Sequence, residues 1–197
     1  KEMNADPVPM IRIQQKTYLD KIISQADYEY LKRRLAEDEE LVYYFVIRMI
    51  TATGVRVSEL VTFQVEDVHQ GYKDIYSKGD KMRRVYIPSR LKEELLKWPE
   101  FAARKSRALF LNRFGAPVTP SGVRTRLKTF AARYGLDPEV MYPHSFRHRF
   151  AKNFIEACGD IAFLSDLLGH ESIETTRIYL RRSSAEQYRI VNKVVDW

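Results

Sequence analysis

Apolar residues recur at the three- and four-residue spacing of amphipathic helices along most of this chain. Behind Ser24, a candidate helix N-cap, Tyr28, Leu31 and Leu35 form one apolar face. The segment from Glu40 to Ala52 is apolar on nearly all of its sides. Because a helix of that kind avoids water on every face, the pattern predicts a buried central helix here.

The stretch 64–88 has a different pattern. Ile75 and Val85 belong to two runs rich in strand-forming residues, and Gly79-Asp80 between them is a turn signal. These features predict an antiparallel hairpin. An additional short strand near Val65–Val68 would make the sheet three-stranded.

Helical patterns resume after the hairpin and continue towards the C-terminus. Prolines and small polar residues stand at the beginnings of these segments, as is usual at helix N-termini. The chain is therefore predicted to be mainly α with a small antiparallel β-sheet, an α+β fold. The predicted helices are 88–97, one that starts behind Thr119, His144–Ala157, one from Asp160 to a cap at Gly169, and one that opens at Ser183.

Length and composition place the chain among globular proteins. It has 197 residues, 45% of them hydrophobic and 30% charged, which suits one ordinary domain with its own core. No apolar run approaches the roughly 18 residues of a membrane span, and Lys1–Asp20 has no signal-peptide pattern. The single cysteine, Cys158, lies in an apolar helical stretch and is expected to be a buried structural thiol. These features predict a cytoplasmic protein without a membrane partner.

The charge balance agrees with a nucleic-acid partner. The net charge is +7, from 33 basic and 26 acidic residues, an excess that many soluble proteins share. The clustering of basic residues is more informative, because such clusters neutralise backbone phosphates of double-stranded DNA. A solvated basic face is the alternative for each cluster. The candidates for contacts with the DNA backbone are Lys81, Arg124, Lys128 and Arg177.

The C-terminal third of the chain carries the clearest candidate chemistry. His144 and Arg147 are three residues apart and share one helix face, His170 follows the predicted helix end, and Tyr179 lies nine residues further on. Arginine binds two phosphate oxygens at once, imidazole moves a proton near pH 7, and tyrosine can attack phosphorus. The set suggests metal-free phosphoryl transfer, in which cationic side chains take the role of a metal ion.

Taken one at a time, the candidate residues leave alternatives open. Arg56 follows the central helix in a tight turn, where its charge needs a partner, either Glu59 or a bound phosphate. His148 lies on the same helix face as His144 and competes with it for the role in proton transfer. A lone tyrosine in an amphipathic helix usually packs, and a lone histidine–arginine pair usually lies on a helix surface.

Three motifs contain these residues. The first is TGVRVSEL, which contains Arg56, and the second is SKGDKMRRVYIP, which contains Lys78. The third, near the C-terminus, consists of HSFRHRFA, LLGH and a Thr-x-x-Tyr that ends at Tyr179. Together they resemble the C-terminal, first-arginine and hairpin-lysine motifs of the tyrosine recombinase (phage integrase) family. The resemblance runs from about Ser24 to Leu180 and implies the catalytic-domain fold of that family.

The resemblance also implies site residues. It prefers Lys78 over its rival Lys81 in the hairpin, and it leaves His148 to packing or to a supporting contact behind the catalytic residues. The implied catalytic set is Arg56, Lys78, His144, Arg147, His170 and Tyr179.

The implied activity is that of a site-specific DNA recombinase, an integrase or transposase of a mobile element. Such an enzyme cleaves and rejoins strands through a 3′-phosphotyrosyl intermediate, without a metal or another cofactor, as a tetramer on DNA at the bacterial nucleoid. Two alternatives are a type IB topoisomerase-like enzyme with the same chemistry and a DNA-binding module whose active site is unused.

The implied organisation has three parts. Residues 1–17 are a linker or arm, residues 18–182 the catalytic domain, and residues 183–197 a C-terminal helix that packs on its own core or on a neighbouring subunit. The N-terminal core-binding domain that is usual in the family is not expected in this chain, so isolated binding to DNA is expected to be weak and strongly salt-dependent.

Overall fold

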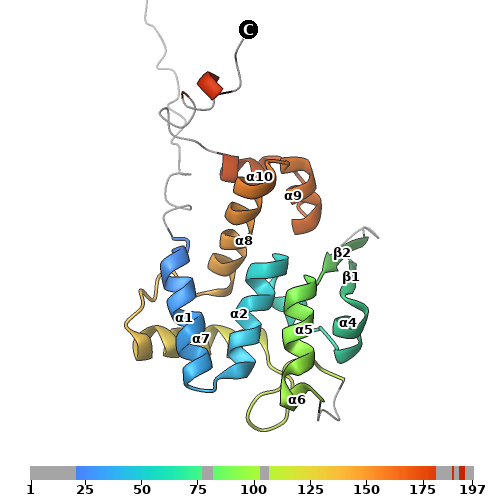
Figure 1. Cartoon of the computed structure of the whole chain (residues 1–197), viewed down its shortest axis with the longest axis vertical. Coiled ribbons are helices and arrows are strands. Elements are labelled where there is room, and N and C mark those ends of the chain that lie inside the picture. Colours follow the sequence, from blue (N-terminus) through green and yellow to red (C-terminus); the bar gives the residue numbers. More distant parts are fainter. Residues whose placement is uncertain (1–20, 77–81, 103–106, 181–187, 189–190, 194–197) are drawn as a thin grey trace, which may run out of the picture.

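The computed structural model describes residues 21–76, 82–102, 107–180, 188 and 191–193. Helices pack around the central α2, and a two-stranded hairpin lies to one side of them (Figure 1). The expected mainly α fold with a small antiparallel sheet is confirmed, and no described helix is long and apolar enough to span a membrane. The elements are α1 (Gln25–Glu37), α2 (Leu41–Thr53), α3 (Val57–Leu60), α4 (Val65–Gln70), β1 (Tyr72–Tyr76), β2 (Met82–Tyr86), α5 (Ser89–Lys97), α6 (Pro99–Ala102), α7 (Pro120–Tyr134), α8 (Pro143–Cys158), α9 (Ile161–Leu168), α10 (Glu174–Arg177) and a 3-10 turn at Ile178–Leu180.

Polar residues begin three of the helices where the sequence predicts it. The Ser24 side chain accepts the Asp27 N–H at 2.9 Å at the start of α1. The side chains of Thr119 and Asp160 accept backbone N–H groups in the same way at the starts of α7 and α9. Each bond satisfies a donor that the first turn of a helix leaves without an intrahelical partner.

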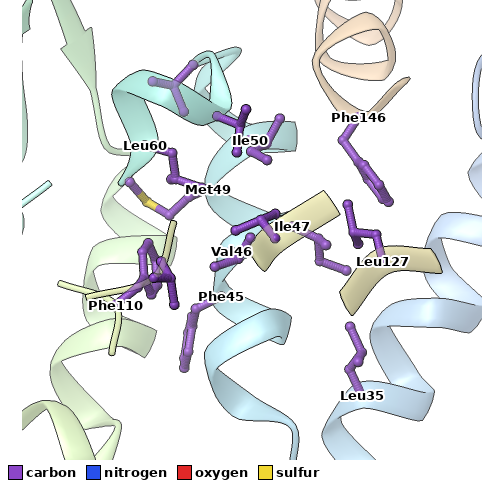
Figure 2. Packing of buried hydrophobic residues seen from close by; sticks show 14 of the residues in the cluster. Leu35, Phe45, Val46, Ile47, Met49, Ile50, Leu60, Phe110, Leu127 and Phe146 are labelled. Atoms are coloured by element: carbon purple, nitrogen blue, oxygen red, sulfur yellow. The ribbon is translucent and has the colours of Figure 1, made fainter. Parts of the chain in front are cut away.

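Helix α2 is the centre of the hydrophobic core, as its all-round apolar pattern predicts. Phe45, Ile47 and Met49 extend from it in different directions and are buried (Figure 2). Leu35 of α1 and Phe146 of α8 belong to the same cluster. Full burial of a side chain of this size contributes about 1.5–3 kcal/mol. The core therefore fixes the start of α8, the helix that carries His144 and Arg147, against α2.

The hairpin has two strands, and the segment expected to be its third strand is a helix. Strands β1 and β2 pair antiparallel over their whole length. The expectation of a strand near Val65–Val68 is wrong, because these residues lie in α4. The Asp67 carboxylate accepts the Gln64 N–H at 2.8 Å and so stabilises the first turn of this helix. The predicted Gly79-Asp80 turn lies outside the described residues.

A smaller hydrophobic cluster joins α8 to α9. Ala151 and Ile155 of α8 meet Leu164 and Leu168 of α9, and Tyr179 packs against the same cluster. Helix α9 also contacts β2, so it lies between α8 and the hairpin (Figure 1). The end of α9 is thereby brought close to the first turns of α8.

Cys158 is exposed, so the expectation of a buried thiol is wrong. It is the last residue of α8, and Gly159 turns the chain away directly after it. Ile155, one turn earlier, is the last residue of this helix in the smaller cluster. The apolar stretch therefore continues in the sequence beyond the point where α8 leaves the core.

Candidate active site

Arg147 is buried near the start of α8, with 3% of its surface exposed. Its Nη1 donates to the Gly54 carbonyl at 2.5 Å and its Nη2 to the Leu168 carbonyl at 2.7 Å. Gly54 follows the last residue of α2 and Leu168 is the last residue of α9, so both carbonyls lie at the negative ends of helix dipoles. Because these acceptors are neutral, they hold the guanidinium in place without cancelling its positive charge.

Arg56 lies beside the same end of α9. It is the N-cap of α3, and its backbone N–H and its Nη1 donate to the Glu59 carboxylate at 2.8 and 3.1 Å. Its Nη2 donates to the Gly169 carbonyl at 3.3 Å. Of the two partners that the sequence left open, Glu59 is thus in contact with Arg56. The same contact turns the guanidinium towards the helix end that holds Arg147.

Arg83 of β2 belongs to this group of arginines, although the sequence motifs did not single it out. Its Nη2 donates to Glu59 Oε2 at 2.5 Å and its Nη1 to the Leu167 carbonyl at 3.0 Å. The signal that could have found it is the alternation of β2, in which Arg83 and Val85 are buried and the residues beside them are exposed. An arginine on the apolar face of a strand requires buried polar partners.

The last turn of α9 therefore collects three guanidinium groups. The carbonyls of residues 167–169 accept hydrogen bonds from Arg83, Arg147 and Arg56, in that order. Carbonyls at a helix C-terminus lack intrahelical partners and are ready acceptors. Among the described residues, the ion pairs of this group are those of Arg56 and Arg83 with a single carboxylate, that of Glu59. We call this group of four side chains the arginine cluster.

The electrostatics of the arginine cluster reflect an excess of positive charge. Burial and then the neighbouring Arg56 and Arg83 lower the pKa of Arg147 to about 9, which leaves it protonated at neutral pH. Burial acts to raise the pKa of Glu59, but the Arg56 N–H and the Arg83 guanidinium outweigh it and hold this pKa below its ordinary value. Three cations and one anion leave a net positive charge, which favours a bound anion.

His170 is directed back towards the arginine cluster by Gly169, which ends α9 in the left-handed conformation with φ of 62°, as predicted. His170 Nε2 lies 3.2 Å from Arg147 Nη2, and its Nδ1 lies 2.8 Å from Thr176 Oγ1. Because arginine only donates, Nε2 is the acceptor and Nδ1 carries the proton. Burial and then Arg147 lower the pKa of His170 to about 4, so its ring is neutral at pH 7.

His144 lies in the first turn of α8, on the side of the helix that faces solvent. Partial burial lowers its pKa, and the positive charges of Arg147 and Arg56 lower it further. A ring of this kind is neutral near pH 7 and can accept a proton. The exposed position next to the arginine cluster is accessible to a substrate from outside.

Tyr179 lies in the 3-10 turn after α10, and its hydroxyl contacts Nδ1 of His148. The two ring centroids are 5.7 Å apart. His148, which was expected to pack or to make a supporting contact, is buried, and its contact with Tyr179 was not foreseen. Burial, and then the nearby His144 and Arg147, lower the pKa of His148 to about 4. The Tyr179 hydroxyl is thus in contact with His148, the residue that follows Arg147 in α8.

The remaining candidates are the two hairpin lysines and three basic residues of α7 and α10. Lys78 and Lys81 are outside the described residues. Arg124 and Lys128 are exposed on α7, although Lys128 donates to a backbone carbonyl, and Arg177 pairs with a glutamate in its own helix. Within the described part of the chain, no three His, Cys, Asp or Glu side chains are grouped as metal ligands would be.

Comparison with known proteins adds evidence that is independent of this geometry. A family model described as the phage integrase family matches residues 16–186. Tyrosine recombinase XerD of Corynebacterium glutamicum is 34% identical over 141 residues, which are 68% of this chain and 46% of that protein. Tyrosine recombinase XerC of Alcanivorax borkumensis is 30% identical, also over 68% of this chain and 46% of that protein. The chain therefore spans about half the length of the curated relatives it matches.

Solved structures share the fold at lower sequence identity. The crystal structure of XerA recombinase has a TM-score of 0.71 and 24% identity, and the match covers 87% of this chain and 64% of that one. The catalytic domain of bacteriophage HP1 integrase has a TM-score of 0.58 and 23% identity, over 89% of this chain and 96% of that one. The Tn1549 transposon integrase, in complex with transposon right-end DNA, has a TM-score of 0.71 and 17% identity, over 88% and 65%. With a family model that matches most of its residues and relatives of this similarity, the chain belongs to the phage integrase family of tyrosine recombinases.

Proposed function

We propose that this chain is the catalytic part of a site-specific DNA recombinase, which cleaves and rejoins strands through a 3′-phosphotyrosyl intermediate without a cofactor. The observation that carries the proposal is the arginine cluster, in which Arg56 and Arg83 share the Glu59 carboxylate and Arg147 is held by neutral backbone carbonyls. Buried cations without full compensation are unfavourable unless an anion binds. A phosphodiester supplies one negative charge, and more develops on its oxygens during phosphoryl transfer.

In this proposal Arg56 and Arg147 bind the non-bridging oxygens of the scissile phosphate. Both guanidinium groups are already oriented by hydrogen bonds to the end of α9, so little freedom is lost when DNA binds. His170 contacts Arg147 from one side as a neutral ring and so orients it without adding charge. Preorganised donors of this kind stabilise the charge that develops in the transition state.

The proposed reaction has two steps that mirror each other. The Tyr179 oxygen attacks phosphorus, His144 takes the phenol proton, the bond from phosphorus to the 5′-oxygen breaks, and Lys78 gives that oxygen a proton. Help with the phenol proton is needed because the ordinary pKa of tyrosine is about 10. The 5′-hydroxyl of another strand then attacks the phosphotyrosine and releases Tyr179. The contact between Tyr179 and His148 is the resting position that the tyrosine leaves before it attacks.

Double-stranded DNA is the proposed partner, and the exposed Arg124 and Lys128 of α7 are the proposed backbone contacts, together with Lys81 and Arg177. The Tn1549 integrase of similar fold is bound to transposon DNA, which supports this choice and the assignment to a mobile element. We further propose that the chain acts as a tetramer on DNA at the nucleoid. In that assembly residues 1–17 are the arm, residues 18–182 the catalytic domain, and residues 183–197 the helix that contacts a neighbouring subunit.

A trapping experiment tests the proposal. The chain is incubated at low salt with nicked duplexes of randomised sequence, from which the short strand 5′ to the nick diffuses away after cleavage, and covalent protein–DNA adducts are separated on a denaturing gel. We expect an adduct with the wild-type chain and with Tyr30→Phe, a partly exposed tyrosine of α1 outside the site, and none with Tyr179→Phe. An adduct with Tyr179→Phe would disprove the assignment of the nucleophile.

Three further measurements separate the remaining classes of function. Relaxation of supercoiled plasmid without preference for a sequence would indicate a topoisomerase-like enzyme. Binding to DNA without any adduct would indicate a module with an unused active site. Cleavage that EDTA abolishes and Mg²⁺ restores would contradict the proposed metal-free chemistry.

A further inference from the structure

Arg83 is a buried charge that the proposed reaction does not use. It lies in β2, 9% exposed, on the same face of the strand as Val85. Its neighbour Arg84 points the other way, pairs with Asp74 of β1 at 2.8 Å and lies over the ring of Tyr72. Two adjacent arginines of one strand thus have different surroundings, and the exposed one is a natural control for the buried one.

The two hydrogen bonds of Arg83 connect it to both arginines that are proposed to bind the phosphate. Through Nη2 it holds Glu59 Oε2, while the other oxygen of the same carboxylate holds Arg56 Nη1. Through Nη1 it holds the Leu167 carbonyl, one residue before the carbonyl that accepts from Arg147. Arg83 is therefore connected to Arg56 through one shared carboxylate and to Arg147 through two consecutive backbone carbonyls of α9.

The backbone around Arg83 is shaped to admit its side chain. A Cβ atom on Gly169 would lie 2.4 Å from both Cδ and Nε of Arg83, so a side chain at this position would displace the arginine. Gly169 also has a positive φ. Both the clash with Arg83 and this backbone conformation therefore favour glycine at this position. The Arg83 side chain consequently passes directly against the turn that leads to His170.

We propose that Arg83 is a positioning residue for strand cleavage, which joins the hairpin to Glu59 and to the end of α9 and so sets the direction of Arg56 and Arg147. This inference rests on the proposed function. In this scheme Arg83 acts on the phosphate through Arg56 and Arg147 and not by direct contact. Its removal should therefore slow the chemical step more than it weakens DNA binding.

The first test compares Arg83→Met, Arg83→Lys and the control Arg84→Met in the trapping assay, with single-turnover rates of adduct formation. A displacement of catalytic groups by about 1 Å lowers rates by up to about 10²-fold. We expect Arg83→Met to lose about 10- to 100-fold in rate, Arg84→Met to stay within about twofold of the wild-type rate, and Arg83→Lys, which keeps the charge but has a single donor group, to fall between them. Affinity for uncleaved duplex, measured in the Tyr179→Phe background, should change less than about threefold for all of them.

A double-mutant cycle with Glu59→Gln identifies the route of the effect. If Arg83 acts through Glu59, the double variant Arg83→Met/Glu59→Gln loses little more rate than the slower single variant, because both changes break the same connection. Additive losses would overturn the inference that Arg83 directs Arg56, because the shared carboxylate would then have no part in its effect. A loss of DNA affinity equal to the loss of rate would also overturn it, since Arg83 would then bind the phosphate itself.

The outcomes separate this inference from the proposed function. An absence of adduct with the wild-type chain counts against the recombinase proposal. An adduct that forms equally fast with wild type, Arg84→Met and Arg83→Met counts against Arg83 alone. Circular dichroism melting of each variant defines an assay temperature at which all of them are folded, and Arg83→Lys covers the case in which Arg83→Met does not fold.

Discussion

Arg147 Nη2 lies 3.2 Å from His170 Nε2, and this contact determines which nitrogen of the imidazole carries the proton. Arginine has donors and no acceptor, so Nε2 must present its lone pair and Nδ1–H must point to Thr176 Oγ1, 2.8 Å away. A chain of hydrogen bonds thus runs from a buried threonine through a neutral histidine to a buried arginine. Each of its members can be changed separately.

Thr176→Val should break this series of hydrogen bonds with little change in side-chain volume. The variant leaves the Nδ1–H of His170 without its acceptor, and a buried group deprived of its partner costs about 1–3 kcal/mol. We expect the rate of adduct formation to fall about 10-fold, because the ring rotates or changes tautomer. Thr175→Val, at an exposed position in the same helix, is the control. Equal rates for the two variants would show that this hydrogen bond has no part in the reaction.

Arg147→Lys should be far more damaging than its conservative appearance suggests. Lysine cannot bridge the Gly54 and Leu168 carbonyls and also present a planar fork to a phosphate. Loss of one donor to a developing oxyanion lowers rates by about 10²–10³-fold, and we expect a loss of this size in adduct formation. Arg149→Lys is the matched control, because Arg149 is also buried in α8 but donates to the Ile23 carbonyl at the other side of the helix. It should lower the melting temperature and leave the rate of the folded chain within about threefold.

Gly169→Ala should combine backbone strain with a steric clash. An alanine in the left-handed conformation costs about 1–2 kcal/mol, and at this position its Cβ also meets Arg83 at 2.4 Å. Gly135→Ala, after α7, has a similar φ of 65° with no atom within 4 Å of the added carbon, so it measures the strain alone. We expect both variants to be less stable in urea titrations, with the larger loss in Gly169→Ala. Slower adduct formation is expected in that variant alone, and a similar slowing in Gly135→Ala would argue against a local effect at Arg83.

The stability of the chain should fall in weak acid because of His148 and His170. Their pKa values are about 4 in the folded chain, against 6.5 for an unperturbed histidine. The unfolded chain therefore binds more protons between these two values, so the free energy of unfolding is highest above pH 6.5 and decreases as the pH falls towards 4. For the buried His148 the slope is at most about 1.4 kcal/mol per pH unit.

Urea titrations at pH 7.5, 6 and 5 measure this slope. His148→Asn and His170→Asn should each reduce it, because each removes one group that takes up a proton on unfolding. His69→Asn changes an exposed histidine of α4 and serves as the control. A slope unchanged in both site variants would mean that other groups cause the loss of stability in acid.

The choice between Lys78 and Lys81 can be made with a modified leaving group. A 5′-bridging sulfur leaves as a thiolate, whose pKa of about 8.5 makes a proton donor unnecessary. If Lys78 protonates the 5′-oxygen, Lys78→Ala should be inactive on ordinary DNA and regain cleavage on the sulfur-containing duplex. Lys81→Ala should lose affinity in a salt-dependent way and show no such rescue. Rescue of Lys81→Ala instead would exchange the two roles.

Much of the fold was predictable because its signals are local. The cap at Ser24, the left-handed Gly169 and the apolar surface of α2 each depend on residues within a few turns of one another. The prediction was wrong where one segment carried both a strand signal and a helix signal. The apolar pair in Val65–Val68 suggested a strand, but the capping bond of Asp67 selects a helix.

The motifs by themselves also determined which residues to bring together: Arg56, His144, Arg147, His170 and Tyr179 could all be named from the sequence. Apart from Glu59 beside Arg56, their partners could not be. Arg83 and Glu59 are 24 residues apart, and Arg147 and Gly54 are 93 apart, so only the packing of β2, α2 and α8 around the end of α9 makes them neighbours. The reason is physical: a helix cap is satisfied within one turn of chain, whereas a buried charge must take its partners from whichever elements pack around it.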